Sequence, residues 1–326
     1  MASSAKKTLI VITGPTGVGK TELCIELAKH YGTEIINADS RQVYAEMPIG
    51  TAAPTAAEQA RVKHHFVGTK HIGDYYSASL YEQDVLKLLQ HYDEAAGMHD
   101  NTAGNSNETV ANRDVLILTG GSMMYIDAVC NGIDDIPTIR EDIRELMKQR
   151  LADEGLEAMV EELHSLDPEY WNIVDRHNPR RVIHALEICH QTGLTYTSFR
   201  TGSKKERPFN TIKIGITRAR EELYERINAR VLKMVGKGLI DEVTSLLPYR
   251  DSNALNTVGY KEVLKYLDGD IPLEEAIRQI QSNTRQYARK QLTWYKRDEE
   301  MTWFSPDNKE AIIDFIDNKL ISIHEH

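Results

Sequence analysis

The fold of this chain is decided by the stretch TLIVITGPTGVGKT, which covers residues 8–21. Residues 8–12 form a continuous apolar and β-branched run, as a parallel strand buried on both faces requires. The following loop fits the pattern G-x-x-x-x-G-K-[ST], and a helix is predicted over residues 19–30. In this pattern, backbone N–H groups surround a pyrophosphate, the lysine neutralises phosphate charge and the hydroxyl coordinates Mg²⁺. We therefore predict a diphosphate site, with Thr21 as the metal ligand, at Gly14, Pro15, Thr16, Gly17, Val18, Gly19, Lys20 and Thr21.

Polar residues follow two further predicted strands, at the point where each strand ends. Residues 34–38 lead into Asp39, and residues 115–118 lead into a Thr-Gly-Gly-Ser turn that closes on Ser122. Strands that alternate with helices form right-handed βαβ units and a parallel sheet. The ligand site of such a sheet lies beyond the carboxyl ends of its strands. We therefore expect Asp39, Ser122 and the glycine loop to lie close together.

The position of Asp39 after an apolar strand is compatible with three roles. Asp39 could reach Mg²⁺ through Thr21, act as a general base that faces an acceptor, or cap the next helix. The strand at 115–118 is not followed by an acidic residue that could polarise a water molecule, and no Asn-Lys-x-Asp motif occurs. A motor ATPase or a GTPase is therefore a poor match.

Helical patterns alone occupy residues 139–193, and strand character returns only at 211–216. Asn178 before Pro179 is a helix start, and Gly193 is a helix end. We therefore predict an α/β fold in which a P-loop-type parallel sheet is flanked by helices and carries an inserted all-helical subdomain. The core would comprise residues 1–137 and 206–326, and the insert residues 138–205. Within the core, later helices are predicted at 220–235, 240–247, 260–267 and 272–296, with a last strand at 301–304.

Composition is that of an ordinary globular protein, with 326 residues, 41% apolar and 27% charged. No apolar run reaches the roughly 18 residues of a membrane span, and no signal region precedes the first strand. Cys24, Cys130 and Cys189 lie far apart without metal-ligand spacing, which favours reduced thiols and a cytoplasmic location. Residues 97–112 are rich in Gly, Asn, Thr and Ser and predict an exposed loop.

Basic residues are concentrated in places, although the formal net charge is −10. Six basic residues and no acidic ones lie within 278–297, and helical spacing aligns Arg278, Arg285, Arg289 and Lys296. This basic stripe indicates a surface for a phosphodiester backbone, with a solvated or interdomain helix as the alternative. Arg220 and Arg226 are either a solvated pair near glutamates or guanidinium groups that reach the phosphates.

Together these motifs resemble the tRNA dimethylallyltransferases (tRNA isopentenyltransferases) of the bacterial type. The matches run in family order over nearly the whole chain and are far more specific than a glycine loop alone. Beyond the loop they comprise NADSRQVY at 37–44, MPIGTA at 47–52, GGSMMY at 120–125, NPRR at 178–181, ALE at 185–187, VGYKE at 258–262 and KQLTWY at 290–295.

The resemblance implies transfer of a dimethylallyl group from dimethylallyl diphosphate to the exocyclic amine of the adenosine just 3′ of the tRNA anticodon. Asp39 would then orient that amine as general base, while Lys20, Thr21 and Arg220 hold the departing pyrophosphate with Mg²⁺. A monomer would clasp the anticodon stem-loop with its helical insert. The implied tRNA contacts are Asp39, Ser40, Arg41, Gln42, Ser122, Arg144, Asn178, Pro179, Arg180 and Arg181, to which the basic stripe adds Arg285 and Arg289.

The chain departs from the family pattern in several places. Ser122 stands where members usually carry Thr, and GTAAP at 50–54 replaces the usual Gly-Thr-Ala-Lys-Pro, which leaves a phosphate contact without its cation. The 97–112 segment looks longer than usual, and no Cys/His zinc-finger segment follows Ile323, as in bacterial members. The long helical insert and the basic C-terminal helix favour this family over three alternatives: an adenylate isopentenyltransferase, a P-loop kinase of small metabolites and a non-catalytic RNA-binding protein.

Overall fold

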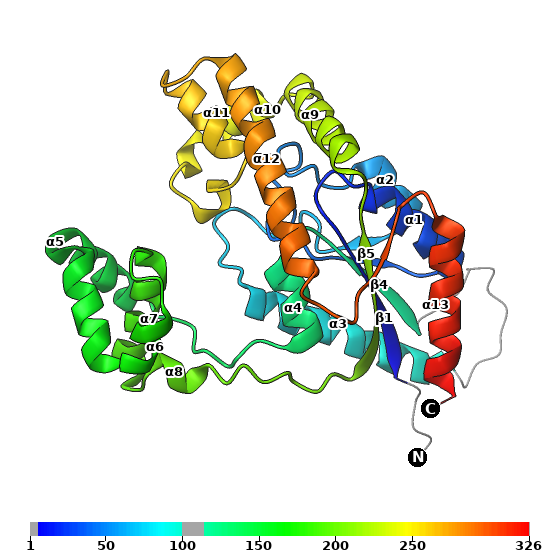
Figure 1. Ribbon diagram of the computed structural model, residues 1–326, viewed down its shortest axis with the longest axis horizontal. Coiled ribbons are helices and arrows are strands. Elements are labelled where there is room, and N and C mark those ends of the chain that lie inside the picture. The colour runs from blue at the N-terminus through cyan, green and yellow to red at the C-terminus, as the bar shows by residue number, and fades with distance from the viewer. Residues whose placement is uncertain (1–5, 100–113, 326) are drawn as a thin grey trace. The chain divides into compact units, whose positions relative to one another are not determined.

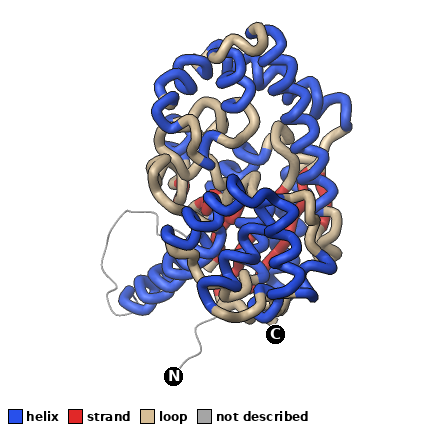
Figure 2. The backbone as a smooth tube through the Cα atoms, turned by 90° about the vertical axis from the view of Figure 1, so that its left-hand side faces the viewer, coloured by secondary structure: helices blue, strands red, loops and turns tan. Residues whose placement is uncertain are grey.

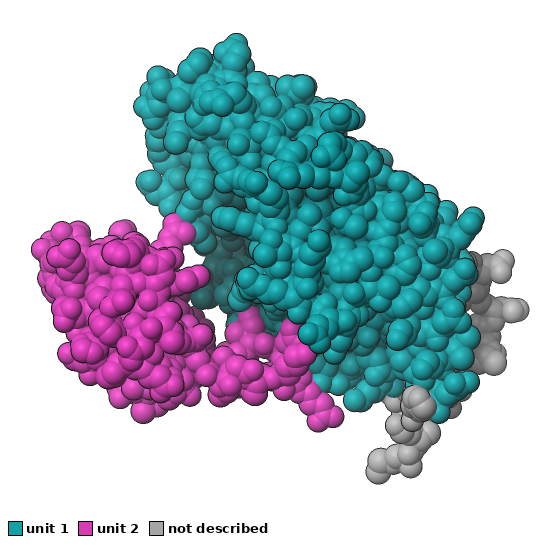
Figure 3. Space-filling model, viewed as in Figure 1, with its two compact units in different colours: residues 1–130, 207–326 teal, residues 131–206 magenta. Residues whose placement is uncertain are grey.

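The computed structural model describes residues 6–99 and 114–325, and the chain divides into two compact units (Figures 1 and 3). Unit 1 comprises Met1–Cys130 and Arg207–His326, and unit 2 comprises Asn131–Glu206. Unit 2 therefore begins before the predicted insert at 138–205 and ends one residue after it. Helices account for most of the regular structure, and the strands are confined to one sheet (Figure 2).

Unit 1 is built on a parallel six-stranded sheet with the order β3-β2-β4-β1-β5-β6, which confirms the predicted α/β class. β1 lies at the centre, where Ile10 is opposite both Ile117 of β4 and Ile212 of β5. The two-residue edge strand β3 was not predicted, because two polar histidines carry no strand signal. The strands are β1 (Lys7–Thr13), β2 (Ile35–Asn37), β3 (His64–His65), β4 (Val115–Thr119), β5 (Phe209–Ile216) and β6 (Thr302–Phe304).

Both faces of the sheet are covered by helices, since alternate residues of each strand point to opposite sides. Leu9 and Val11 pack on the face covered by α3 (Ala78–His99) and α4 (Met123–Asn131). Ile10 and Ile12 pack on the other face, against α1 (Lys20–Tyr31) and α13 (Lys309–His324) (Figure 1). The first strand is therefore buried on both faces, as its unbroken apolar sequence predicted.

The predicted loop at 97–112 begins too early. Helix α3 continues to His99, so residues 97–99 are helical, and residues 100–112 lie outside the described part of the chain. The predicted helix at 240–247 also ends sooner, because Pro248 follows and a short 3₁₀ turn replaces the last residues. The remaining helices of unit 1 are α2 (Ala56–Arg61), α9 (Arg220–Gly236), α10 (Leu239–Ser245), α11 (Tyr260–Leu267) and α12 (Leu273–Tyr295).

All regular structure in unit 2 is helical. Its core consists of side chains such as Met147, Leu163 and Leu186. Helix α7 begins and ends as its sequence predicts: the side chain of Asn178 caps the N-terminus, and Gly193 ends the helix with φ of 70°. The helices are α5 (Glu141–Leu166), α6 (Pro168–Ile173), α7 (Pro179–Thr192) and α8 (Tyr196–Phe199). Of the helices in the described residues, none is long and apolar enough to cross a membrane.

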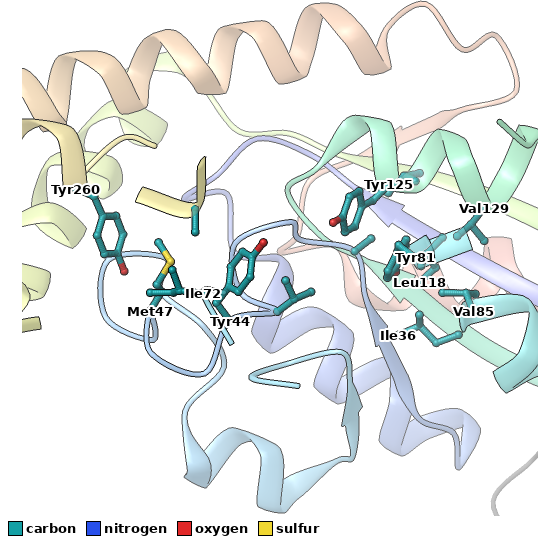
Figure 4. Close-up of a cluster of buried hydrophobic side chains, with 14 of the residues drawn as sticks. Ile36, Tyr44, Met47, Ile72, Tyr81, Val85, Leu118, Tyr125, Val129 and Tyr260 are labelled. Atoms are coloured by element: carbon teal, nitrogen blue, oxygen red, sulfur yellow. The ribbon is translucent and has the colours of Figure 1, made fainter. Parts of the chain in front are cut away.

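Tyrosines in the core of unit 1 fix the end of β2, where Asp39 follows. Tyr81 of α3 is completely buried and stacks on Tyr125 of α4, with ring centroids 4.4 Å apart (Figure 4). The hydroxyl of Tyr81 donates to the carbonyl oxygen of Asn37 at 3.0 Å. The last residue of β2 is therefore held from below, which positions the residues that come after it.

Candidate active site

The glycine loop follows β1 at the carboxyl edge of the sheet and leads into α1. Gly14, Gly17 and Gly19 have φ of 149°, 83° and 110°, a region that favours glycine. A Cβ atom at Gly14 would lie 2.5 Å from the carbonyl oxygen of Ile216. Glycine is therefore required for the turns of the loop and for its packing against the end of β5.

Backbone N–H groups around the start of α1 can bind an anion. In residues 6–99 and 114–325, no acceptor is bound to the N–H groups of Gly17, Gly19, Lys20 and Thr21. A helix N-terminus with free N–H groups attracts negative charge, and the dipole of α1 adds to that attraction. Thr21 is exposed beside them. The loop thus offers a diphosphate the donors that its sequence pattern requires.

The ammonium group of Lys20 lies against the same loop. Its Nζ atom donates to the carbonyl oxygens of Gly14 at 2.8 Å and Pro15 at 3.0 Å. Burial, together with the positive charge of Arg230, lowers the pKa of Lys20 to about 8. A bound diphosphate would favour the protonated form, because an adjacent negative charge stabilises a cation.

Three arginines reach the glycine loop from the segment that follows β5. The Nε atoms of Arg218 and Arg226 donate to loop carbonyl oxygens at 2.9 and 2.8 Å. Arg230 lies 3.3 Å from the hydroxyl oxygen of Thr16, which its guanidinium group contacts through Nη1. Together with Lys20, these residues surround the loop with positive charge.

Arg220 was the arginine selected from the sequence, and the structure does not bring it into these loop contacts. Its guanidinium group is exposed and contacts Tyr224, with Nε 3.2 Å from the hydroxyl oxygen. Arg226 was weighed in the sequence, whereas Arg218 and Arg230 were missed. A signal for Arg218 was present, because it comes two residues after Ile216, at the carboxyl end of a parallel strand.

Asp39 uses one carboxylate oxygen to hold the chain that follows β2. Its Oδ1 accepts hydrogen bonds from the N–H groups of Arg41 at 2.9 Å and Gln42 at 3.2 Å. Its Oδ2 is directed towards Gly121, where a Cβ atom would lie only 2.7 Å away. Burial raises the pKa of Asp39, although the two backbone hydrogen bonds and the charge of Lys20 act to lower it. The capping role is therefore observed at a turn, and Oδ2 is left for chemistry.

The loops after β2 and β4 contact each other directly, as their shared sheet edge predicted. The N–H of Ala38 donates to Thr119 at 2.7 Å, and the N–H of Ser122 donates back to Ala38 at 3.0 Å. A Cβ atom at Gly120 would lie 2.1 Å from the carbonyl oxygen of Ala38, so only glycine fits. The Oγ atom of Ser122 accepts from the N–H of Ser40 at 2.8 Å.

The side chains that follow Asp39 differ in their availability to a ligand. Gln42 donates through Nε2 to the carbonyl oxygens of Thr51 and Ala52, at 3.1 and 3.3 Å, and so holds that loop. In the described part of the chain, no acceptor is bound to the guanidinium group of Arg41, which is partly exposed. Arg41 is therefore the side chain of this segment that is open to a further partner.

The other predicted tRNA contacts lie in unit 2. The Oδ1 atom of Asn178 accepts from the N–H of Arg181 at 3.4 Å, so this side chain already caps α7. Pro179, Arg180 and Arg181 are exposed in the first turn of α7, and Arg144 is partly exposed on α5. Their contact with RNA stays a prediction.

The basic stripe on α12 is less uniform than its sequence indicates. Arg278 pairs with Glu275 at 2.7 Å, so the expectation that no acid relieves the stripe was wrong there. Arg285 is partly buried and donates to Oδ1 of Asn228 at 2.6 Å. Arg289 and Lys296 are exposed and have no bonded partner among the described residues.

Several comparisons with known proteins agree on one family. The family model described as "IPP transferase" matches residues 42–298. The chain is 55% identical over 309 residues to "tRNA dimethylallyltransferase 1" of Bacteroides thetaiotaomicron, covering 95% of each chain. It is 56% identical over 309 residues to the protein of the same name in Phocaeicola vulgatus, covering 95% of this chain and 97% of that one.

Solved structures give the same result. A full-length tRNA isopentenylpyrophosphate transferase from Bacillus halodurans is 35% identical with a TM-score of 0.69, and the match covers 98% of this chain and 99% of that one. A eukaryotic dimethylallyltransferase described as acting on tRNA has a TM-score of 0.78 over 97% of this chain and 80% of that one. At 23% identity, the second match shows a shared fold.

Proposed function

This chain belongs to the IPP transferase family, and from that premise we propose that it is a tRNA dimethylallyltransferase. It transfers a dimethylallyl group from dimethylallyl diphosphate to the N6 amine of the adenosine immediately 3′ of the tRNA anticodon and releases pyrophosphate. The observation that carries this proposal is the meeting of a diphosphate loop and the carboxylate of Asp39 at one edge of the sheet.

The chemistry follows from what surrounds each reacting atom. The C1–O bond of the donor breaks, and its electron pair leaves with the pyrophosphate. Free N–H groups of the loop stabilise that leaving group, as do the cations of Lys20, Arg218, Arg226 and Arg230. The lone pair of N6 forms the new bond to C1, and Asp39 accepts the proton that N6 loses. Burial raises the pKa of Asp39, which makes its carboxylate a stronger base than a solvated one.

Mg²⁺ would bind at the hydroxyl of Thr21. Among the described residues, no group of three or more His, Cys, Asp and Glu side chains is arranged to hold a metal ion. Mg²⁺ is commonly held by one or two protein groups together with substrate phosphates and water. The exposed Thr21 beside the free N–H groups of α1 suits that kind of site. When bound, the ion supplies positive charge to the leaving pyrophosphate.

The acceptor is the anticodon stem-loop, whose target adenosine must leave its stack to reach Asp39. Arg41 is the open guanidinium group nearest to that carboxylate in the chain, and we assign it to the flipped base. Exposed cations at 180–181 in unit 2 and Arg289 on α12 would hold the phosphodiester backbone. A monomeric, cytoplasmic enzyme completes the proposal, and light scattering of the purified protein tests the monomer.

One transfer assay tests this function. The protein is incubated with Mg²⁺, labelled dimethylallyl diphosphate and an anticodon stem-loop with adenosine at the target position. A stem-loop with guanosine at that position is the matched control. Label should enter only the adenosine stem-loop. Label in AMP alone would indicate an adenylate isopentenyltransferase, and γ-phosphate transfer from ATP would indicate a kinase; either result contradicts the proposal.

A further inference from the structure

The side-chain amide of Gln291 on α12 joins two loops of the active site. Gln291 is completely buried. Its Oε1 accepts from the N–H of Thr16 in the glycine loop at 2.8 Å, and its Nε2 donates to the carbonyl oxygen of Gly121 at 2.7 Å. One side chain thus spans from the loop after β1 to the loop after β4.

Each of these partners belongs to a different side of the reaction. Thr16 lies in the loop that receives the donor diphosphate, and its N–H is taken by Gln291 while later N–H groups stay free. Gly121 borders the acceptor side, because a Cβ atom there would lie 2.7 Å from Oδ2 of Asp39. Tyr287, one turn earlier on α12, also donates to the carbonyl of Gly121, at 2.8 Å.

The bridge requires a side chain that accepts and donates at the same time. A glutamine amide does both, through its oxygen and its nitrogen. An ionised carboxylate can only accept, and a methionine of similar length does neither. The sequence stretch at 290–295 matched the family pattern without giving Gln291 a role, because both of its partners lie far away along the chain.

We propose that Gln291 is a positioning residue that holds the diphosphate loop and Asp39 in the relative arrangement that transfer requires. This inference rests on the proposed dimethylallyl transfer. Since a reacting carbon and nitrogen must meet at close range and in line, a small shift of one loop against the other lowers turnover more than binding. Gln291 acts through Thr16 and Gly121, and touches neither substrate.

Two substitutions and one control test the proposal. Gln291→Met removes both hydrogen bonds without adding charge, and Gln291→Glu keeps the acceptor but loses the donor when ionised. Gln279→Glu introduces the same charge on α12, about 18 Å along the helix from Gln291. For each variant we would measure kcat between pH 5.5 and 8.5, the KM for dimethylallyl diphosphate, and the thermal midpoint.

Several charged or titratable groups act on a carboxyl introduced at position 291. Asp39 and Tyr287 carry or develop negative charge beside it, while Lys20, Arg41 and Arg230 carry positive charge. The protonated carboxyl resembles the amide, because it both donates and accepts. The ratio of kcat for Gln291→Glu to kcat for the wild type should therefore fall as pH rises.

We expect Gln291→Met to lower kcat at least tenfold at every pH with less than a threefold change in KM, and Gln279→Glu to match the wild type. Wild-type kcat in Gln291→Met overturns the proposal. A ratio for Gln291→Glu that stays flat with pH also overturns it, since a merely structural defect lowers kcat equally at all pH values.

A milder variant covers the case in which changes at Gln291 prevent folding. Tyr287→Phe removes one hydrogen bond from the carbonyl of Gly121 and leaves Thr16 untouched. It should lower kcat about threefold or more with KM unchanged, and an unchanged kcat in this variant overturns the proposal. A wild-type protein without any transfer activity would refute the proposed function instead, so the two failures are distinguishable.

Discussion

The two carboxylate oxygens of Asp39 face different parts of the site. Oδ1 accepts the two N–H groups that shape the turn at residues 40–42, and Oδ2 faces Gly121. An asparagine can keep the first interaction through its own Oδ1, but it cannot accept a proton at neutral pH. The structural and chemical roles of this residue can therefore be separated by a single substitution.

Asp39→Asn should lower kcat for dimethylallyl transfer by at least about a hundredfold, the usual scale of general-base catalysis. The thermal midpoint and the affinity for the stem-loop should change little, because the turn and its neighbours keep their contacts. Single-turnover transfer and a binding titration measure both quantities. Asp251→Asn, at an exposed carboxylate, is the control. Wild-type turnover in Asp39→Asn would remove this residue from the chemistry.

Arg226 and Arg220 lie on the same helix and differ in what they contact. Arg226 donates to the glycine loop, and Arg220 contacts Tyr224. Arg226→Gln should raise the KM for dimethylallyl diphosphate about tenfold, because a charged hydrogen-bond donor beside the diphosphate is lost. Arg220→Gln should raise it less. Steady-state kinetics of both variants decide the matter, and the reverse order would return Arg220 to the phosphate site.

At the level of helices and strands, the edge of the sheet is fastened by Glu34, just before β2. Glu34 accepts hydrogen bonds from His65 of β3 at 2.5 Å and from Tyr92 of α3, and it pairs with Lys63 at 3.2 Å. Burial disfavours the charged form of Glu34, but these partners outweigh burial and lower its pKa to about 2. The ionised carboxylate therefore stabilises the folded state.

The pH dependence of this contribution follows from the direction of the shift. The stabilisation by Glu34 is fully present above its ordinary pKa of 4.5 and is lost as pH falls towards 2. Glu34→Gln should therefore lower the free energy of unfolding by on the order of 1 kcal/mol at pH 7, and the gap to wild type should narrow below pH 4.5. Urea unfolding at several pH values measures this gap, with Glu299→Gln as an exposed control. A gap that does not change with pH would contradict the assignment.

Helix α12 carries cations in three different situations. Arg278 is paired with Glu275, Arg285 bonds to α9, and Arg289 is exposed without a bonded partner among the described residues. Arg289→Gln should therefore reduce the salt dependence of stem-loop binding by about 0.7–0.9 in the slope of log K against log salt, as for one lost phosphate contact. Arg278→Gln should change it less. Equal slopes for Arg289→Gln and wild type would mean that α12 does not contact RNA there.

At the scale of the whole molecule, unit 1 has its own core and a closed boundary. The chain leaves it after Cys130 and returns at Arg207, whose guanidinium group donates to the carbonyl of Ala128 and to Glu82, both at 2.6 Å. These contacts hold the two chain ends of unit 1 without help from unit 2.

Replacement of residues 131–206 by a short Gly/Ser linker should therefore leave unit 1 folded. The shortened protein should still bind pyrophosphate, because the glycine loop and its arginines all lie in unit 1. It should lose most of its affinity for the stem-loop. Circular dichroism and calorimetry with each ligand measure these outcomes, and full stem-loop affinity would show that unit 2 is not the tRNA-binding part.

The sequence by itself determined the features that depend on near neighbours. The strand-loop-helix at 8–31 is encoded by an apolar run, fixed glycines and a lysine, so its form and its ligand class could be predicted together. The limits of α7 followed from Asn178 and Gly193. The convergence of Asp39 and Ser122 was also predictable, because carboxyl ends of parallel strands share one edge.

Only the tertiary structure decided which distant side chains meet at that edge. The choice of Arg218 and Arg230 over Arg220, and the bridge from Gln291 to Thr16 and Gly121, depend on how α9 and α12 pack. Such contacts join residues separated by up to 275 positions, and no local pattern encodes them. The physical reason is that helix and turn signals act through neighbouring backbone groups, whereas a catalytic arrangement depends on long-range packing.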